Sequence, residues 1–390
     1  MKILMLFADM LRPDRFNIYN QMIEPNAMDH LIKDIGGNLY KNCFTPAPDT
    51  PRSMASFYTG LSPLKNNCNA RVKWPGKFLD SNQATIFDPF ISNNYAMHFF
   101  SNPNERQGGL FPPGIENIGI HNDDYRLDNY LNSLTLEKDH LLFISLPDYH
   151  WALQDWGYTK KGEKIAINEI KKSIDVVFQE FHKDDFDHIF IFSDHGFKFD
   201  YQMKVEEDFQ FINKDRTNIF LLHREKGNNS INYKDRLCSI QDLTHTINDL
   251  FDLHNEFSLL KENEREYVVI EDHLSISAPE VNQNVDIWGV ATKNEIYVRT
   301  LNDGFIIKGD KSYEQKIDLK YDEILVNETQ FGRYFDEHQK VFSYNELILA
   351  QTNFMNGGSR PEENLTQKLL RYKEISKDRV GAYLNKLIKN

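Results

Sequence analysis

The sequence is poor in cysteine and contains no long apolar run. Its 390 residues include three cysteines, Cys43, Cys68 and Cys238, which are widely separated and form no CxxC pair. This spacing argues against a disulfide framework and against a thiolate zinc site. No stretch approaches the roughly eighteen apolar residues of a membrane-spanning helix, and the apolar opening segment 2–7 is too short for a secretory signal. We therefore expect a soluble cytoplasmic protein in a reducing compartment, with no membrane insertion.

Positive charge is also in deficit. The chain has 45 Lys and Arg against 58 Asp and Glu, which gives a formal net charge of -13. Such a balance repels polyphosphate backbones, so we expect no nucleic-acid partner, although a local basic pocket for one anion is compatible with it. The 40% of hydrophobic residues are enough for a large buried core. The composition favours one large globular domain with an appendage.

What the sequence does contain is apolar segments that end abruptly in polar residues. The clearest is 189–192, rich in isoleucine and phenylalanine, which is followed by Ser-Asp194-His195-Gly196. The apolar run predicts a buried parallel strand. Ligands in open α/β sheets lie at the carboxyl ends of strands, so Asp194 and His195 are candidate metal ligands. The alternative is an ordinary polar turn after a strand.

Two other predicted strands end in the same way. Segment 3–7 is followed closely by Asp9, a second candidate ligand, whose alternative role is to cap the next helix. Segment 141–146 is followed by Asp148 and His150. Because these two residues are two positions apart, an extended chain would point both side chains to one side, which suits joint metal coordination.

A proline-rich loop before residue 53 carries the candidate nucleophile. We predict a helix over 53–58, so that the hydroxyl of Thr50 lies at a helix N-terminus, where the amides and the dipole stabilise an alkoxide and an anionic substrate. Arg52 adds a bidentate clamp for an anion. The alternative reading makes Thr50 an ordinary N-cap.

Taken together, Asp9, the segment from Thr50 to Gly60 and the turn 193–196 resemble the alkaline phosphatase superfamily over residues 1–255. The sulfatase-like branch fits best, followed by the nucleotide pyrophosphatase and phosphonate monoester hydrolase branches. The resemblance implies an α/β fold, a three-layer α/β/α sandwich around a mostly parallel sheet. In that family the nucleophile lies ten residues before the glycine, which here is Thr50. Sulfatases carry a cysteine there that becomes formylglycine, so threonine favours phosphodiesterase-like chemistry.

The resemblance also implies the metal ligands. One divalent ion would be held by Asp9, Thr50, Asp194 and His195. Asp148 and His150 would begin a second metal site, whose third ligand we predict to be His273, with His223 and His245 as further candidates. A one-metal enzyme in which His150 binds the substrate or protonates the leaving group explains the same residues. Oxygen and imidazole ligands favour zinc or manganese and are compatible with calcium or magnesium.

Two residues are candidates for binding the substrate. Asn102 would donate to a phosphoryl oxygen where sulfatases place a lysine; its alternative role is a turn before Pro103. Lys198 lies where family members carry a lysine or histidine that faces the transferred group; its alternative is a solvated surface lysine. The intervening segment 103–127 predicts a long loop that covers the site.

The chain is predicted to have three parts. Residues 1–275 would form the sulfatase-like catalytic core, in which 216–222 resembles its edge strand. Residues 276–335 predict a small antiparallel β subdomain, and 336–390 a C-terminal helical segment. The last helices would either pack across the core or mediate homo-oligomerisation.

The expected reaction is an in-line displacement at phosphorus. Thr50 attacks, and the phospho-threonine intermediate passes to water or to an acceptor hydroxyl. This predicts a metal-dependent hydrolase of phosphate mono- or diesters acting on a small anionic ester or saccharide. The nearest alternative is a phosphoester transferase that modifies an intracellular saccharide or lipid precursor. A sulfatase and an inactive anion-binding pseudoenzyme are further alternatives.

Overall fold

The computed structural model describes most of the chain outside the C-terminal part. The described residues are 1–69, 75–80, 82–101, 119–121, 127–136, 139–157, 159–197, 212–273, 286–300, 303–308, 312–329 and 331. Among them, no helix combines the length and apolar character that crossing a membrane requires.

A large sheet forms the centre of the molecule. Its strands are β1 (Lys2–Ala8), β2 (Gly37–Phe44), β3 (Ala96–Phe100), β4 (Gly119–His121), β5 (His140–Leu146), β6 (His188–Phe192), β7 (Leu221–Glu225) and β8 (Ile231–Ser239). They lie in the order β4-β3-β5-β1-β6-β7-β2-β8. All run in one direction except β7, which is antiparallel to both of its neighbours. Because β7 lies inside the sheet, the prediction that 216–222 forms an edge strand is wrong.

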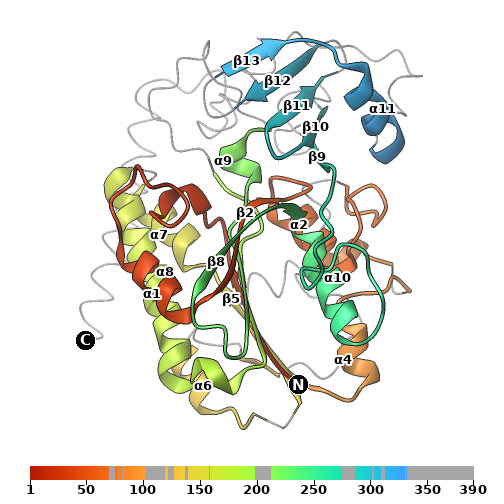
Figure 1. Cartoon of the computed structure of the whole chain (residues 1–390). Helices are drawn as coiled ribbons and strands as arrows, with labels where there is room; N and C mark the ends of the chain where they lie inside the picture. Colours follow the sequence, from red (N-terminus) through yellow and green to blue (C-terminus); the bar gives the residue numbers. More distant parts are fainter. Residues whose placement is uncertain are drawn as a thin grey trace, which may run out of the picture.

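Helices cover both faces of this sheet. They are α1 (Ala27–Ile35), α2 (Thr50–Thr59), α3 (Pro75–Phe78), α4 (Asp88–Ser92), α6 (Leu127–Asn132), α7 (Asp148–Trp156), α8 (Lys160–Glu180), α9 (Lys214–Thr217) and α10 (Gln241–Leu250). Figure 1 shows α1, α7 and α8 on one side of the sheet and α2, α4 and α10 on the other.

Strand β1 shows why two layers of helices form. Every residue from Ile3 to Ala8 is buried, so the strand needs cover on both faces. Successive side chains point to opposite faces. Leu4 and Leu6 belong to the apolar cluster that contains residues of α1, α7 and α8, and Met5 belongs to the cluster that contains residues of α2 and α10. The predicted three-layer α/β/α sandwich is therefore confirmed.

A second, smaller sheet is wholly antiparallel. It contains β9 (Val268–His273), β10 (Asp286–Ala291), β11 (Glu295–Arg299), β12 (Gly304–Lys308) and β13 (Ser312–Gln315), in the order β13-β12-β11-β10-β9. Helix α11 (Leu319–Glu328) packs on it, because Leu325 joins an apolar cluster with Trp288 and Val290. The first strand of this sheet lies before the predicted boundary at 275. The predicted helical segment 336–390 lies outside the described residues.

The register of the large sheet brings the predicted polar strand ends together. Phe7 in β1 pairs with Phe192 in β6, and Ala8 pairs with Leu146 in β5. The three strands therefore stop at nearly the same level. Asp9 and Asp194 follow two residues after a matched pair, which places both carboxylates at one edge of the sheet.

Candidate metal centre and nucleophile

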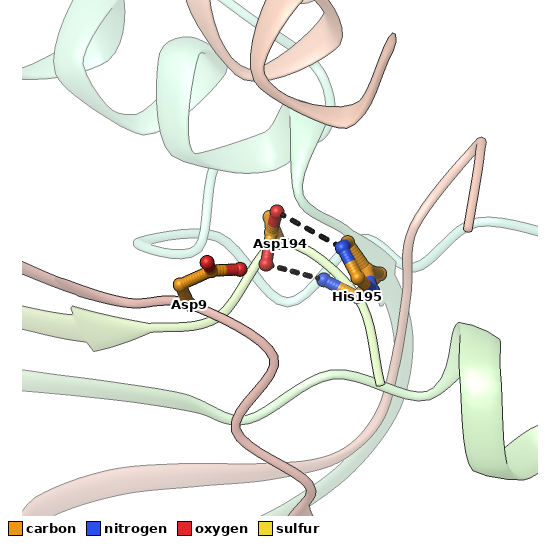
Figure 2. A group of neighbouring side chains, drawn as sticks. All are labelled: Asp9, Asp194 and His195. Atoms are coloured by element: carbon orange, nitrogen blue, oxygen red, sulfur yellow. Dashed lines mark hydrogen bonds and ion pairs between the residues drawn. The ribbon is translucent and has the colours of Figure 1, made fainter. Parts of the chain in front are cut away.

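Three side chains converge at the carboxyl ends of β1 and β6. Asp9, Asp194 and His195 each offer one ligand atom, and these atoms all lie within 4.8 Å of one another (Figure 2). Their side chains come from two segments that are far apart in the sequence. The residues are 8%, 0% and 9% exposed, so the cluster is largely shielded from water.

Asp194 is held in place by backbone amides. Its Oδ1 accepts hydrogen bonds from the amide of Met10 at 3.2 Å and from that of His195 at 2.8 Å. Met10 has a φ of 62°, a left-handed conformation that is uncommon outside glycine. The second oxygen, Oδ2, is buried and has no hydrogen-bond partner within the described part of the chain. It lies 3.5 Å from His195 Nε2.

The tautomer of His195 follows from its neighbours. Its Nδ1 lies 2.8 Å from the carbonyl oxygen of Gly196, which can only accept, so Nδ1 carries the hydrogen. The lone pair of the neutral ring is then on Nε2, the nitrogen that faces Asp194. A ring oriented in this way by a backbone carbonyl is typical of a metal-ligating histidine.

Asp9 is oriented by a histidine from another element. Its Oδ2 lies 2.7 Å from His150 Nδ1 in α7. The other ring nitrogen of His150 lies 2.8 Å from the amide nitrogen of Gln154. Because an amide nitrogen donates, this ring nitrogen accepts, and Nδ1 donates to Asp9. The Oδ1 of Asp9 is buried and lacks a hydrogen-bond partner among the residues that the structure describes.

The two carboxylates differ in pKa. Burial, together with the charge of Asp9, raises the pKa of Asp194 to about 6. Burial also acts to raise the pKa of Asp9, but the favourable electrostatic interaction with His150 and the hydrogen bond that this histidine donates outweigh burial, so the pKa of Asp9 is lowered. The centre thus holds two adjacent buried carboxylates, each with one oxygen that no described residue hydrogen-bonds. A divalent cation would fit this charge, and two oxygens with one imidazole nitrogen suit zinc or manganese.

Thr50 is the first residue of α2, which begins three positions before the predicted start. The N-cap is Asp49, whose side chain accepts from the amide of Arg52. The alternative reading of Thr50 as the N-cap is therefore wrong. Its hydroxyl instead lies 3.3 Å from His195 Nε2, beside Asp194. The structure thus brings the predicted nucleophile beside the three predicted ligands.

Arg52, predicted to clamp an anion, is fully buried. Its Nε donates to Asp49 Oδ2 at 2.6 Å, and its Nη2 donates to Asp272 Oδ1 at 3.1 Å. Protein carboxylates therefore occupy the predicted clamp.

Asp148 and His150 do not lie on an extended chain. Both are in the first turn of α7, where residues two positions apart point to different faces of the helix. The prediction that they project to one side is wrong. His150 reaches Asp9 instead, and the described residues include no further group of three metal ligands besides the one at Asp9.

The other candidates for a second metal site lie elsewhere. His223 is inside β7, where its Nε2 lies 3.2 Å from His188 Nδ1. His245 is in α10, beside Gly60 at the far end of α2. The backbone of His273 ends β9 in the small sheet. The side chain of His273 and the residues Asn102 and Lys198 lie outside the described part, so their roles stay predictions.

Sequence reasoning missed several residues that shape the centre. Ser53 donates to the carbonyl oxygen of Asp194 at 2.8 Å and accepts from Thr45 Oγ1 at 2.8 Å, which attaches α2 to the Asp194 turn. No sequence signal identifies this contact. Asp49 could have been found, because aspartate before Thr-Pro is a typical N-cap. Finding Gln154 required knowing that α7 begins at Asp148.

No protein-family model and no curated protein matches the sequence. Solved structures do match. A 2-O GAG sulfatase superposes with a TM-score of 0.62 at 13% identity, over 91% of this chain and 93% of its own. The phosphonate monoester hydrolase of Agrobacterium radiobacter gives a TM-score of 0.56 at 13% identity, over 90% of this chain and 96% of its own.

A protein in the alkaline phosphatase superfamily from Vibrio parahaemolyticus gives a TM-score of 0.57 at 12% identity, over 92% of this chain and 88% of its own. At such identities the likeness concerns the fold. It confirms the sulfatase-like architecture that the sequence resemblance implied.

Proposed function

We propose that this chain is a divalent-metal-dependent hydrolase of phosphate mono- or diesters with Thr50 as its nucleophile. One observation carries the proposal. The hydroxyl of Thr50 lies 3.3 Å from His195 Nε2. Next to it are two buried carboxylates, and one oxygen of each, Asp9 Oδ1 and Asp194 Oδ2, has no hydrogen-bond partner within the described residues. A nucleophile beside a preformed cation site is what ester hydrolysis through a covalent intermediate requires.

The residue type at position 50 supports phosphorus over sulfur. Sulfatases of the resembled family use a formylglycine at this position, and a threonine cannot be converted to formylglycine. The phosphonate monoester hydrolase among the structural neighbours supports the same reading, since its name describes an ester of a phosphorus acid. Sulfate esters are the competing substrate class, and p-nitrophenyl sulfate tests for them.

The residues of the chain have separate tasks in this chemistry. A cation held by Asp9, Asp194 and His195 would supply positive charge that favours the ionised threonine hydroxyl and an anionic ester. His150 orients Asp9, and the amides of Met10 and His195 orient Asp194. The N-terminus of α2 adds a favourable dipole at Thr50.

The bonds change in two steps. The oxygen of Thr50 forms a bond to phosphorus as the bond to the leaving oxygen breaks; the threonine proton is lost to solvent, and the leaving group takes up a proton. Water then attacks the phospho-threonine, which releases phosphate or a phosphate monoester and restores the hydroxyl. An acceptor alcohol in place of water makes the same intermediate serve a transferase.

The test compares three ester probes and two variants. Purified protein is assayed with p-nitrophenyl phosphate, bis-p-nitrophenyl phosphate and p-nitrophenyl sulfate, after chelation and after addition of zinc or manganese. We expect metal-dependent turnover of a phosphate ester, a loss of at least about 10³-fold in Thr50→Ala, and partial activity in Thr50→Ser. Adding glycerol distinguishes transfer from hydrolysis, because a transferase yields glycerol phosphate.

Unchanged turnover in Thr50→Ala would overturn the nucleophile. A preference for the sulfate ester would overturn the substrate class, and no turnover of any probe with any metal would favour the anion-binding protein.

A further inference from the structure

A buried cluster of four charged residues lies where the small sheet meets the large one. Its members are Asp49, Arg52, Arg216 and Asp272, which are 8%, 0%, 7% and 0% exposed. Asp272 belongs to β9 of the small sheet, and the other three belong to segments next to the candidate centre. The cluster balances two positive charges with two negative ones, as buried charges require.

One half of the cluster leads from Asp272 to Thr50. Oδ1 of Asp272 accepts from Arg52 Nη2 at 3.1 Å, and Arg52 Nε donates to Asp49 Oδ2 at 2.6 Å. Asp49 also caps α2 by accepting from the amide of Arg52. Because Asp49 immediately precedes Thr50, these contacts fix the backbone that carries the threonine.

The other half leads from Asp272 to His195. Oδ2 of Asp272 accepts from Arg216 Nη1 at 2.9 Å, and the carbonyl oxygen of Arg216 accepts from the amide of Gly196 at 2.9 Å. The approach is close, since a Cβ at Gly196 would lie 2.1 Å from the carbonyl oxygen of Asp215. The position of α9 therefore sets the turn that carries His195.

Two further contacts attach the loop before Thr50 to the same strand and helix. The amide of Glu271 in β9 donates to the carbonyl oxygen of Pro46 at 2.9 Å. Arg216 Nη2 donates to the carbonyl oxygen of Pro48 at 3.4 Å. Both carboxylate oxygens of Asp272 are thus used, one toward the threonine helix and one toward the histidine turn.

We propose that Asp272 is a positioning residue through which the small antiparallel sheet sets the distance between Thr50 and His195. It acts through Arg52 and Arg216 and touches no substrate. This inference rests on the proposed function for its effect on turnover. Its effect on metal affinity does not depend on turnover, because His195 is a candidate ligand.

The test compares Asp272→Asn with a matched variant in the same part of the molecule. Asp322 in α11 is also a buried carboxylate, 8% exposed, and accepts from Arg299 Nε at 3.1 Å and from the hydroxyl of Tyr297 at 2.8 Å. Asp322→Asn therefore removes a comparable ion pair that does not lead to the centre. Both variants are assayed at a temperature at which circular dichroism shows them folded.

We expect Asp272→Asn to lower kcat by about tenfold or more with little change in KM, since a small misplacement of reacting groups is costly. Its zinc affinity, measured by isothermal titration, should also fall. Asp322→Asn should lower the melting temperature and leave kcat and zinc affinity unchanged. If both variants behave alike in kcat and in zinc affinity, Asp272 is merely structural and the inference is overturned.

Two results keep the test decisive. If the wild-type protein turns over none of the ester probes, the proposed function fails, and zinc affinity alone decides the role of Asp272. If Asp272→Asn does not fold, Arg216→Lys replaces it. Lysine keeps the positive charge but lacks the two guanidinium nitrogens with which Arg216 bonds Asp272 and the carbonyl oxygen of Pro48 at once. We then expect the same direction of change, and wild-type values would contradict the inference.

Discussion

At the scale of single residues, the centre is organised by which oxygen of each carboxylate is already satisfied. Asp9 uses Oδ2 for His150, and Asp194 uses Oδ1 for two backbone amides. The remaining oxygens, Asp9 Oδ1 and Asp194 Oδ2, are buried and lack a hydrogen-bond partner in the described part of the molecule. Unsatisfied buried carboxylate oxygens are costly, so their presence at one point is itself an argument for a cation.

The raised pKa of Asp194, about 6, predicts how the metal-free protein responds to pH. In the folded protein Asp194 holds its proton more tightly than in the unfolded chain, where an aspartate titrates near 4. Between about pH 4 and pH 6 the folded state therefore binds more protons than the unfolded state, and this group lowers the free energy of unfolding as the pH rises. The loss amounts to about 3 kcal/mol over two pH units.

Asp194→Asn removes this loss. In the presence of a chelator, its free energy of unfolding relative to wild type should increase from pH 4 to pH 6, as measured by urea denaturation. Asp128→Asn, at an exposed position of α6, controls for replacing an aspartate. A difference between Asp194→Asn and wild type that does not vary with pH would contradict the charge balance described for the centre.

The clustering of the candidate ligands at the strand ends was predictable at this scale, and their surroundings were not. Asp9, Asp194 and His195 stand directly after apolar runs, and the ends of parallel strands meet at one edge of a sheet. The partners of these ligands come from contacts between distant segments. Ser53 touches the Asp194 turn only because α2 packs there, and Asp272 reaches Arg52 from another sheet.

At the scale of elements, helix α2 carries the proposed nucleophile at one end and a tightly packed glycine at the other. Gly60 ends the helix with a φ of +68°, and a Cβ there would lie 2.9 Å from His245 Nε2. The far end of α2 is thus fixed against α10. Any shift of this end would move the helix whose first residue is Thr50.

Gly60→Ala tests this packing against Gly227→Ala. Gly227 also has a positive φ, +86°, but nothing lies within 4 Å of its Cβ position. We expect Gly227→Ala to lower the free energy of unfolding by about 1 kcal/mol, the cost of the left-handed backbone alone. Gly60→Ala should lower the free energy of unfolding by more, because the side chain of His245 must also move. Equal losses in urea denaturation would show that the contact with His245 does not matter.

The predicted helix starts were wrong where no apolar pattern marks the beginning of the helix. Residues 148–150 continue an apolar strand in the sequence, and the extended reading followed from that continuity. The structure turns at Pro147 and starts α7 at Asp148. The start of α2 was placed too late for a similar reason, because the prolines suggested a loop although proline is well tolerated in the first turn of a helix.

At the scale of the whole molecule, the site belongs to two sheets. The large sheet supplies the candidate metal ligands at the ends of β1 and β6. The small sheet, which Figure 1 shows beyond that end of the large one, supplies the Asp272 carboxylate that binds Arg52 in the threonine helix. The sequence predicted the large sheet from its apolar runs and the small sheet from short strands separated by polar turns. It could not predict that β9 packs against the loop before Thr50, since that contact depends on how two separately formed sheets meet.

The most direct test of the central claim is anomalous diffraction from a crystal of the protein soaked in zinc. The account predicts a strong peak about 2.0–2.2 Å from Asp9 Oδ1, Asp194 Oδ2 and His195 Nε2, with the hydroxyl of Thr50 beside it. The peak should disappear in Asp194→Asn crystals soaked in the same way. A zinc-dependent enzyme whose crystals show zinc only at other positions would contradict the account.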